Sequence, residues 1–426
     1  MTKIAVIGTG YVGLTTGACF AHMGHQVVCA DIDPVKIENL RRGVIPIVEL
    51  GLQALVEEGI AEGRLSFVLG AAAAAAGCEI AFLCVPTPQG DDGSADLSYI
   101  EAAAREIGPV LPYEAVVVNK STVPVGSARV VERVMNRPDV KVVSNPEFLR
   151  EGSAVQDFLK PDRVVVGCDD QAAALKVSAL YDGISAPVIV TDPASAETIK
   201  YAANAFLATK LSFINAIAAI CEGVGADVND VVVGMGSDKR IGQDFLRPGP
   251  GWGGSCFPKD SRALVKIARE AGYHFDLLEG VLTINEEQFE RVTDKIRVAA
   301  GGDLSKATVA VWGLTFKART DDLRDSPSLA IIQRLVAAGA TVQAYDPTVD
   351  GPKPGLPTDI TIADTAYTAC KGADVLAVLT EWDEFRWLDI DQVAGAMAGR
   401  AIVDARNLLD RNDWRRASFD YQGIGR

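Results

Sequence analysis

The chain has 426 residues, of which 48% are hydrophobic and 23% are charged, the balance of a globular protein with two or three domains. A net charge of -15 argues against nucleic-acid partners, and no stretch is predicted to be apolar over the length of a membrane span. The eight cysteines lie scattered without a C-x-x-C pair, and only three histidines occur. These features argue against a disulfide framework or a metal site and predict a cytoplasmic protein.

The first predicted elements form a strand, a helix and a second strand. Residues 4–7 are continuously apolar, residues 14–23 have helical character up to a glycine, and residues 27–30 are again apolar. A continuous apolar run is typical of a parallel strand that is covered on both faces. The order therefore predicts the start of a Rossmann-like unit.

The loop of this unit carries G-x-G-x-x-G, formed by Gly8, Gly10 and Gly13. Between a strand and a helix this motif is typical of a dinucleotide site, because its glycines allow a tight turn, close approach of a pyrophosphate, and close helix packing. Asp31 ends the second strand, where a carboxylate can accept a hydrogen bond from a ribose 2′-hydroxyl and repel a 2′-phosphate. We therefore expect NAD rather than NADP.

The next part of the chain continues the alternation of strands and helices. Further strands are predicted at residues 80–85, 115–118, 140–143, 164–166 and 188–190. This pattern predicts an α/β fold with a mostly parallel sheet. Residues 196–221 then lack Gly and Pro and carry apolar side chains at helical spacing, which predicts one long helix that joins two domains.

The C-terminal part repeats the first domain. ATVAVWGLTFK, TVQAYDP and GADVLAVLT resemble TKIAVIGTGYVG, VVCADIDP and GCEIAFLCVPT, in the same order. A second Rossmann-like half is therefore predicted to begin near Ala307. Only Gly313 of its glycine loop remains, so we expect it to bind something other than a dinucleotide.

Four further stretches contain reactive side chains at short spacing. They are NKSTVPVG at 119–126, SNPEFLREG at 144–152, the pair Lys200 and Asn204 on one face of the long helix, and GWGGSCFPKD at 251–260. The last puts a cysteine and an aspartate behind three glycines and an aromatic residue. A buried structural cysteine would need none of these neighbours.

Together with the first-domain fingerprint, these motifs resemble the UDP-glucose 6-dehydrogenase family of four-electron sugar-nucleotide dehydrogenases. The resemblance covers essentially the whole chain, in the order GTGYVGL, VPTP, KSTVPVG, NPEFLREG, K-x-x-x-N, GGSCFPKD, FKARTDDLRDSPS and VDARN. It implies NAD as cofactor, UDP-glucose as substrate, UDP-glucuronate for polysaccharide biosynthesis as product, and a homodimer built around the long helix.

The resemblance also completes the expected architecture. The expected fold is α/β, with two Rossmann-like doubly wound domains joined by a long central helix. Residues 1–195 would form the NAD-binding domain. Residues 196–300 would form a helical dimerisation region that carries the cysteine loop, and residues 301–426 the UDP-sugar-binding domain.

The two-step oxidation of an alcohol to an acid explains the cysteine. The aldehyde formed first has to become a hydride donor again, and a thiolate that adds to it gives a thiohemiacetal, then a thioester. Cys256 is the expected nucleophile, and Asp260, one turn along a helix that starts there, would position water or a lysine.

Four other catalytic roles are implied by the resemblance alone. Lys200 would stabilise the oxyanion at C6, and Asn204 would hold that oxygen or a sugar hydroxyl. Glu147 would act as acid and base in thioester hydrolysis, and Thr122 would hold the catalytic water.

The resemblance also implies which residues surround the two ligands, with Arg240 reaching the sugar nucleotide of a neighbouring subunit. The residues expected at NAD are Gly8, Gly10, Tyr11, Val12, Gly13, Asp31, Lys36, Pro86, Thr87, Ser121, Thr122, Glu151 and Arg324. The residues expected at the UDP-sugar are Glu147, Phe148, Leu149, Arg150, Glu151, Lys200, Asn204, Arg240, Phe245, Gly249, Gly253, Phe316, Lys317 and Arg406.

Several other functions stay open at this point. A GDP-mannose or UDP-N-acetylhexosamine 6-dehydrogenase would share the same chemistry. A two-electron hydroxy-acid dehydrogenase would share the fold and the helix lysine but would not need Cys256. A non-catalytic NAD-binding protein would keep the glycine loop and would have lost the reactive side chains.

Overall fold

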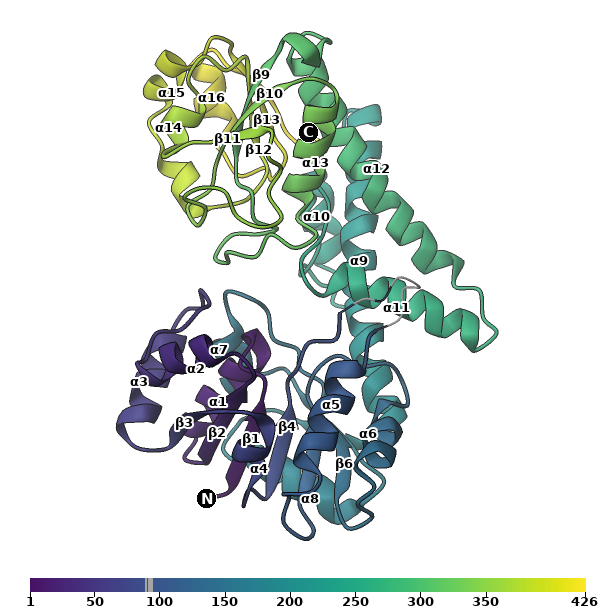
Figure 1. The fold of residues 1–426 in the computed structure, drawn as a ribbon. Helices are drawn as coiled ribbons and strands as arrows, with labels where there is room; N and C mark the ends of the chain where they lie inside the picture. Colours follow the sequence, from purple (N-terminus) through teal and green to yellow (C-terminus); the bar gives the residue numbers. More distant parts are fainter. Residues whose placement is uncertain (89, 91–94) are drawn as a thin grey trace. The chain divides into compact units, whose positions relative to one another are not determined.

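The computed structural model describes residues 1–88, 90 and 95–426, which form two compact units, residues 1–203 and 204–426 (Figure 1). Each unit is built on its own sheet, and helix α9 (Pro193–Val224) begins in the first unit and ends in the second. The predicted pair of Rossmann-like domains with a long central helix is confirmed, and α9 extends beyond the predicted 196–221 at both ends. The division into 1–195, 196–300 and 301–426 stays a prediction.

The first unit contains an eight-stranded sheet in the order β3-β2-β1-β4-β5-β6-β7-β8. Neighbouring strands are parallel except β6 and β7, which meet antiparallel through Ser144 and Gly167. The strands are β1 (Lys3–Ile7), β2 (Gln26–Asp31), β3 (Leu65–Leu69), β4 (Ile80–Leu83), β5 (Val116–Asn119), β6 (Lys141–Ser144), β7 (Val164–Gly167) and β8 (Val188–Thr191). All seven strands predicted in this unit are present, and only the edge strand β3 was not predicted.

Side chains alternate between the two faces of this sheet along each strand, so both faces carry apolar side chains. Helices cover both faces. Ile4 and Val6 of β1 pack in one core with α1, α3 and α7, whereas Ala5 and Ile7 pack in a second core with α4, α5 and α6. The helices are α1 (Tyr11–His22), α2 (Pro34–Arg41), α3 (Leu52–Ala61), α4 (Ala71–Ala75), α5 (Ser98–Ile107), α6 (Ser127–Met135), α7 (Ala154–Leu159) and α8 (Gln171–Ser178).

The second unit contains a fully parallel six-stranded sheet in the order β11-β10-β9-β12-β13-β14. This is the order of a dinucleotide-binding Rossmann sheet. The strands are β9 (Thr308–Trp312), β10 (Thr341–Tyr345), β11 (Ile360–Ile362), β12 (Val375–Val378), β13 (Ala401–Asp404) and β14 (Asp420–Gln422). The predicted start of this half near Ala307 is confirmed by β9.

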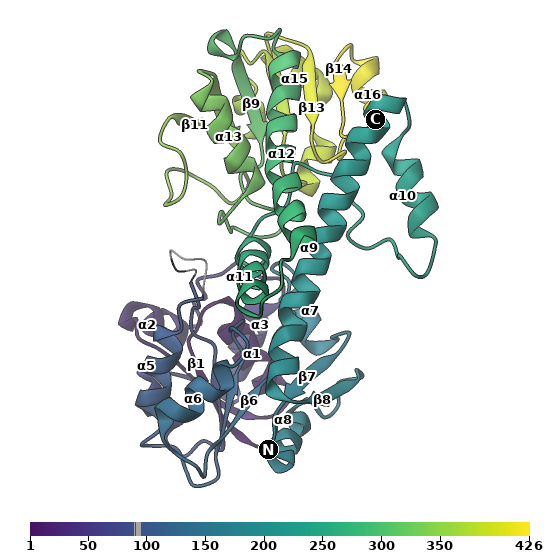
Figure 2. The same ribbon diagram turned by 90° about the vertical axis from the view of Figure 1, so that its right-hand side faces the viewer.

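Two layers of helices also enclose the second sheet. Val309 and Val311 of β9 pack in one core with α12, α13 and the C-terminal part of α9, which lies beside α12 in Figure 2. Ala310 and Trp312 face a second core with α14, α15 and α16. The helices are α10 (Val228–Gly236), α11 (Phe257–Glu270), α12 (Asp276–Ala299), α13 (Pro327–Ala337), α14 (Ala366–Ala369), α15 (Ile390–Ala396) and α16 (Arg411–Arg416).

Helix α9 corrects one expectation from the sequence. Its 32 residues include an 18-residue window of mean hydropathy 1.4, so by length and composition α9 could cross a membrane. The core helix of a globular domain meets the same criteria. Ile214, Ala218 and Cys221 of α9 belong to the buried core of the second unit, which favours a core helix.

Candidate active site

The glycine loop after β1 has the geometry that a pyrophosphate requires. Gly8 has a φ of 97°, its N–H donates to the carbonyl of Ala30 at 2.7 Å, and a Cβ there would lie 2.7 Å from the carbonyl oxygen of Cys84. A Cβ at Gly13 would collide with the carbonyl of Gly8, whereas a Cβ at Gly10 would meet nothing within 4 Å. Helix α1 begins directly after Gly10, so its N-terminus faces this open space.

Asp31 lies beside this loop and is held by it. Its Oδ2 accepts hydrogen bonds from the Thr9 N–H at 3.0 Å and the Thr9 hydroxyl at 2.6 Å, and forms an ion pair with Lys36 at 2.9 Å. Burial by itself would raise the pKa of Asp31, but the bonds from Lys36 and Thr9 together outweigh it and lower the pKa to about 2. Asp31 is therefore an anion at neutral pH, and Lys36, expected at NAD, contacts it.

The other expected cofactor residues of this unit follow β4 and β5 at the same sheet edge. The Thr87 hydroxyl donates to the carbonyl of Thr122 at 2.9 Å, and the Ser121 hydroxyl donates to the carbonyl of Val85 at 2.7 Å. These bonds tie the segment that begins with Pro86 to the segment that carries Thr122. The carboxyl ends of parallel strands on either side of a switch point are where ligands bind in such sheets.

Tyr11 connects the glycine loop to the turn that carries Glu151. Its hydroxyl donates to Glu49, and the N–H of Gly152 donates to the Tyr11 oxygen at 2.9 Å and to Glu49 Oε2 at 2.7 Å. Burial, followed by the bond to Glu49, raises the pKa of Tyr11. Glu49 is 7% exposed and was not predicted from the sequence, because it lies in a loop without a recognisable motif.

Glu147 and Lys200 form the most deeply buried ion pair of the predicted catalytic residues in this unit. Lys200 Nζ lies 3.0 Å from Glu147 Oε1, each side chain is 4% exposed, and Glu147 Oε2 accepts from the N–H of Leu149 at 2.6 Å. The Phe148 ring lies next to two cations, at 3.6 Å from the Arg163 guanidinium and 5.4 Å from Lys200 Nζ. Arg150 turns away from this pair in an ion pair with Asp157 at 2.5 Å.

Lys120 is a second buried cation near this pair, and it was not predicted as a site residue although it lies in the motif NKSTVPVG. Its Nζ donates to Asn145 Oδ1 at 3.0 Å and to the Tyr181 hydroxyl oxygen at 3.3 Å. Burial lowers the pKa of Lys120 to about 8, against the opposing effect of Glu147. Asn145 also donates to the carbonyl of Val165 at 2.7 Å, so this network joins the ends of β5 and β6 to β7.

The second unit holds the expected nucleophile at a helix start. Cys256 is the N-cap residue of α11, and the Asp260 N–H donates to its carbonyl at 2.9 Å, which places Asp260 one turn along the helix as predicted. Asp260 is fully buried. It accepts from Asn204 Nδ2 at 2.6 Å and forms an ion pair with Lys259 at 2.9 Å.

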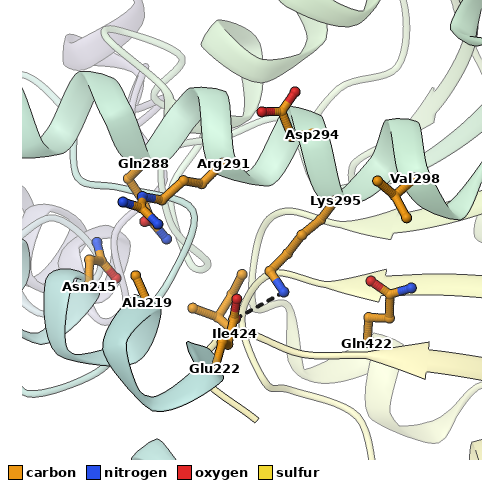
Figure 3. A pocket seen from close by; sticks show the side chains of 10 residues that line it. All are labelled: Asn215, Ala219, Glu222, Gln288, Arg291, Asp294, Lys295, Val298, Gln422 and Ile424. Atoms are coloured by element: carbon orange, nitrogen blue, oxygen red, sulfur yellow. Dashed lines mark ion pairs between the residues drawn. The ribbon is translucent and has the colours of Figure 1, made fainter. Parts of the chain in front are cut away.

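The glycine-rich loop before Cys256 is fixed by two buried amides. The Gly249 N–H donates to Asn215 Oδ1 at 2.8 Å, and Gln288 Nε2 donates to the Gly249 carbonyl at 2.7 Å. Figure 3 shows these two amides on facing helices, α9 and α12, at one end of a pocket of about 280 Å³. An ion pair between Lys295 and Glu222, 2.9 Å apart, lies further along the same pocket.

The same loop packs tightly against the segment that follows β9. A Cβ at Gly253 would collide with the carbonyl of Asp325, and a Cβ at Gly254 would lie 2.7 Å from the Phe316 ring. Lys317 Nζ lies 5.3 Å from the centroid of that ring. Both positions thus require glycine because other groups of the fold fill the space beside them.

The expected substrate arginine Arg406 is engaged by the protein. Its Nε lies 2.8 Å from the carbonyl of Leu379 and 2.9 Å from Glu381, and its Nη2 donates to the carbonyl of Phe316 at 3.0 Å. In this arrangement Arg406 holds the Phe316 segment in place. Its expected contact with the UDP-sugar stays a prediction.

The remaining predicted arginines are exposed and pair with nearby aspartates. Arg240 forms an ion pair with Asp238 at 2.5 Å, and its side chain is 87% exposed. Arg324 forms an ion pair with Asp322 at 2.6 Å. Phe245 packs beside Phe257, with ring centroids 6.1 Å apart.

The structure thus groups the predicted catalytic residues in two sets. Glu147, Lys200 and Thr122 belong to the first unit, and Asn204, Asp260 and Cys256 to the second. Lys200 and Asn204 lie one turn apart on α9. Their assigned roles stay predictions.

A Rossmann sheet, a glycine loop at the N-terminus of α1 and an anionic Asp31 define a dinucleotide-binding oxidoreductase with a second Rossmann-like unit. Residues 2–185 match the NAD binding domain of the UDP-glucose/GDP-mannose dehydrogenase family, residues 194–287 its central domain, and residues 310–411 its UDP binding domain. The chain therefore belongs to this family, which confirms the resemblance found in the sequence, and NAD is its cofactor.

Individual proteins are similar over their full length. A UDP-glucose 6-dehydrogenase of Rhizobium meliloti is 47% identical over 100% of this chain and 99% of its own, and one of Bacillus subtilis (TuaD) is 46% identical over 100% and 94%. A solved UDP-glucose dehydrogenase from Pyrobaculum islandicum has a TM-score of 0.92 at 37% identity and covers 100% of this chain and 98% of its own. A GDP-mannose dehydrogenase from Pseudomonas aeruginosa has a TM-score of 0.55 at 30% identity over 99% of both chains.

Proposed function

We propose that this enzyme oxidises UDP-glucose to UDP-glucuronate in two NAD-dependent steps, through a thiohemiacetal and a thioester on Cys256. The observation that carries the proposal is the position of Cys256 at the N-terminus of α11, one turn before the buried Asp260. A helix N-terminus favours a thiolate over a thiol, as a nucleophile requires. The similarity to UDP-glucose 6-dehydrogenases at 46% and 47% identity supports this substrate.

The residues of the first unit fit NAD. The open space beside Gly10 and the N–H groups at the start of α1 suit a pyrophosphate, and the anionic Asp31 suits a ribose diol. Tyr11 and Val12 lie in the first turn of α1, next to the same space. When bound, NAD accepts one hydride in each of the two oxidations.

The first oxidation requires a base and an oxyanion partner. When C6 of the glucose gives up a hydride, its hydroxyl has to lose a proton, which we assign to the Lys200–Glu147 pair. The Lys200 ammonium then stabilises negative charge that develops on the oxygen, because burial in this pair strengthens its field. Asn204, held by Asp260, is one turn away on α9 and can donate to the same oxygen or a neighbouring hydroxyl.

The second oxidation uses Cys256. Its thiolate adds to the aldehyde carbon, so that a C–S bond forms and the carbonyl oxygen becomes an oxyanion that Lys200 stabilises. Loss of the second hydride from that carbon restores the C=O bond and leaves a thioester. A water held by Thr122 then attacks, Glu147 takes its proton, the C–S bond breaks, and the thiolate leaves from the carboxylate product.

Helix α9 supports a homodimer, which we propose works in the cytoplasm. Four large apolar side chains lie exposed along it, Phe206, Phe213, Ile220 and Val224, with exposures of 66%, 48%, 58% and 72%. The first three are seven residues apart and therefore follow one face of the helix. A second copy that covers this face would bury them. Arg240 is exposed, and it would exchange its ion pair with Asp238 for the sugar nucleotide of the neighbour.

A substrate panel tests the proposal. We expect NADH formation with UDP-glucose, and a rate at least about tenfold lower with GDP-mannose or a UDP-N-acetylhexosamine, since each loses specific polar contacts. The 47% and 46% identity to UDP-glucose 6-dehydrogenases favours this order. Equal rates with GDP-mannose would contradict the substrate assignment and leave the chemistry intact.

A Cys256→Ser variant tests the chemistry separately. A serine hydroxyl is a far weaker nucleophile toward the aldehyde than a thiolate, so we expect formation of acid to fall by more than about a hundredfold. Thermal unfolding should change little, because Cys256 is only half-buried. A variant that still makes the acid at the normal rate would show that the second oxidation does not proceed through a thioester on Cys256.

A further inference from the structure

A buried carboxylate in the first turns of α9 is outside the machinery described so far. Glu197 is 3% exposed and accepts hydrogen bonds from the N–H groups of Gly126 at 2.6 Å and Ala128 at 3.1 Å. It also accepts from the Ser144 hydroxyl at 2.9 Å. Helix α6 starts at Ser127 after a glycine, which has no side chain of its own to cap the helix, so Glu197 caps α6 from another element.

The three segments that meet at Glu197 are those that carry the proposed acid–base groups. Thr122 precedes the α6 cap in the same loop, and Glu147 follows Ser144 in the turn after β6. Lys200 lies three residues after Glu197 and therefore on the same face of α9. Glu197 thus holds together the start of α9, the loop before α6 and the end of β6. Lys200 on α9 and Glu147 after β6 form the 3.0 Å ion pair.

Close packing fixes the start of α9 at the same place. A Cβ at Gly167 of β7 would collide with Ala196, so this turn of α9 lies directly on the sheet. Burial raises the pKa of Glu197, and its bonds to Gly126 and Ser144 oppose that rise. A buried carboxylate is costly unless its oxygens are bonded. Here the donors Gly126, Ala128 and Ser144 come from segments that carry, or lead into, a proposed catalytic residue.

We propose that Glu197 is a positioning residue, which sets the distance between Lys200 and Glu147 by joining α9, the start of α6 and the end of β6. The inference rests on the proposed function, because it assigns Glu197 a part in the proton transfers of that reaction. Glu197 has no contact with substrate in this account. It acts through the two residues that it orients.

A Glu197→Gln variant is the test. Glutamine keeps the size of the side chain, but its amide NH2 faces an N–H or hydroxyl donor. At least one hydrogen bond that links α9 to the start of α6 or the end of β6 is therefore lost. We expect kcat to fall by about tenfold to a hundredfold, with KM for NAD within about threefold, as for a displaced catalytic group. The acid limb of the kcat profile should move to higher pH, because a carboxylate that loses a neighbouring ammonium binds protons more readily.

An Asp170→Ala variant is the matched control. Asp170 caps α8 in the same unit through the N–H of Ala173 at 2.8 Å, far in the chain from the proposed site. We expect it to lower the melting temperature without changing the pH profile. If Glu197→Gln and Asp170→Ala had the same kinetics, Glu197 would be only a helix cap and the inference would be wrong.

A Ser144→Ala variant keeps the inference testable if Glu197→Gln fails to fold. It removes one of the three bonds and leaves the charge, so we expect kcat to fall about threefold, with a smaller shift of the acid limb in the same direction. An unchanged kcat and pH profile would overturn the inference. Wild-type enzyme that forms no NADH from UDP-glucose would overturn the proposed function and this inference with it, so the two failures are distinguishable.

Discussion

Each of the two Rossmann-like units has a glycine turn of the same geometry after its first strand, but the chain that follows the turn differs. Gly8 follows β1 and Gly313 follows β9, each with a φ of 97° and each donating its N–H to the residue at the end of the neighbouring strand, at 2.7 and 2.8 Å. After Gly8 the chain enters α1 almost at once, whereas after Gly313 it runs through a loop to Pro327 before α13 starts. The start of α13 still lies near the carboxyl ends of β9 and β12, because Ser326 Oγ donates to the Leu314 carbonyl at 2.7 Å and Ser328 Oγ lies 3.2 Å from Thr380 Oγ1. The two units therefore differ in the loop between the turn and the helix, which is short in the first unit and long in the second.

The acidic residue at the end of the second strand differs in the same way. Asp31 is half-buried, and one of its partners is the side chain of Lys36, which can move. Asp346 is 1% exposed, and its Oδ2 accepts from Leu314, Thr315 and the Trp382 indole N–H at 2.8 to 3.1 Å. The Asp346 Oδ2 already accepts hydrogen bonds from backbone and indole N–H groups of the fold itself. We therefore expect it not to accept from a ribose hydroxyl. The second unit is thus expected not to bind a dinucleotide, as its reduced glycine loop also predicts.

The largest expected effect comes from placing alanine at the shared turn. Gly8→Ala and Gly313→Ala both force a Cβ into the positive φ region and against neighbouring atoms, 2.7 Å from Cys84 and 2.5 Å from the Thr380 hydroxyl oxygen. Each should lower the free energy of unfolding by about 1–3 kcal/mol. Only Gly8→Ala should weaken NAD binding, by about a hundredfold or more, as measured by calorimetry. An equal loss of NAD affinity in Gly313→Ala would contradict the claim that only the turn at Gly8 takes part in NAD binding.

Buried charges at equivalent strand ends give the next effect. Lys120 follows β5 and Asp404 ends β13, and burial lowers the pKa of Lys120 to about 8 and raises that of Asp404. Because the folded state holds the Lys120 proton less tightly than the unfolded chain, stability should rise with pH from about 8 to about 10, by about 1.4 kcal/mol per unit. Lys120→Met should abolish this rise in urea unfolding curves. A variant that keeps the same slope would show that another group causes it.

Asp404 should act in the opposite sense. Its folded pKa lies above the unfolded value, so its contribution to stability is complete below pH about 4 and is lost as the pH rises through the folded pKa. Asp404→Asn should flatten this part of the curve, with Lys120→Met as the comparison. The two variants together separate the titrations of the two units.

The smallest expected effect comes from replacing Asp31, at the end of β2, or Asp346, directly after β10. Asp31→Asn removes the charge beside Lys36, and we expect KM for NAD to rise about tenfold and discrimination against NADP to weaken. Asp346→Asn should leave KM for NAD unchanged and destabilise the fold, because a buried acceptor of several N–H groups is replaced in part by a donor. A change of KM for NAD in Asp346→Asn would mean that the second carboxylate still reaches the cofactor.

Much of this architecture could be predicted because its signals are local. The apolar run before Gly8, the glycine spacing and the repeat that begins with β9 each lie within a short segment. Strand β3 was not predicted because the exposed Ser66 interrupts its apolar run, whereas β8 at the opposite edge is continuously apolar over residues 188–190 and was predicted.

The residues that the sequence did not reveal act between distant segments. Glu49 bonds to Tyr11, Lys120 to Tyr181, and Glu197 to Gly126, all across tens of residues of chain. No periodicity or motif reports such a pairing. Arg406 was predicted from its motif, but its bonds to the carbonyls of Leu379 and Phe316 join distant segments and could not be predicted.

The most direct test of the account is the number of NADH molecules formed for each UDP-glucose consumed, measured with limiting UDP-glucose and excess NAD. The account predicts two, because the aldehyde stays on the enzyme and is oxidised again through Cys256. A yield of one NADH, with the aldehyde or another two-electron product, would contradict it.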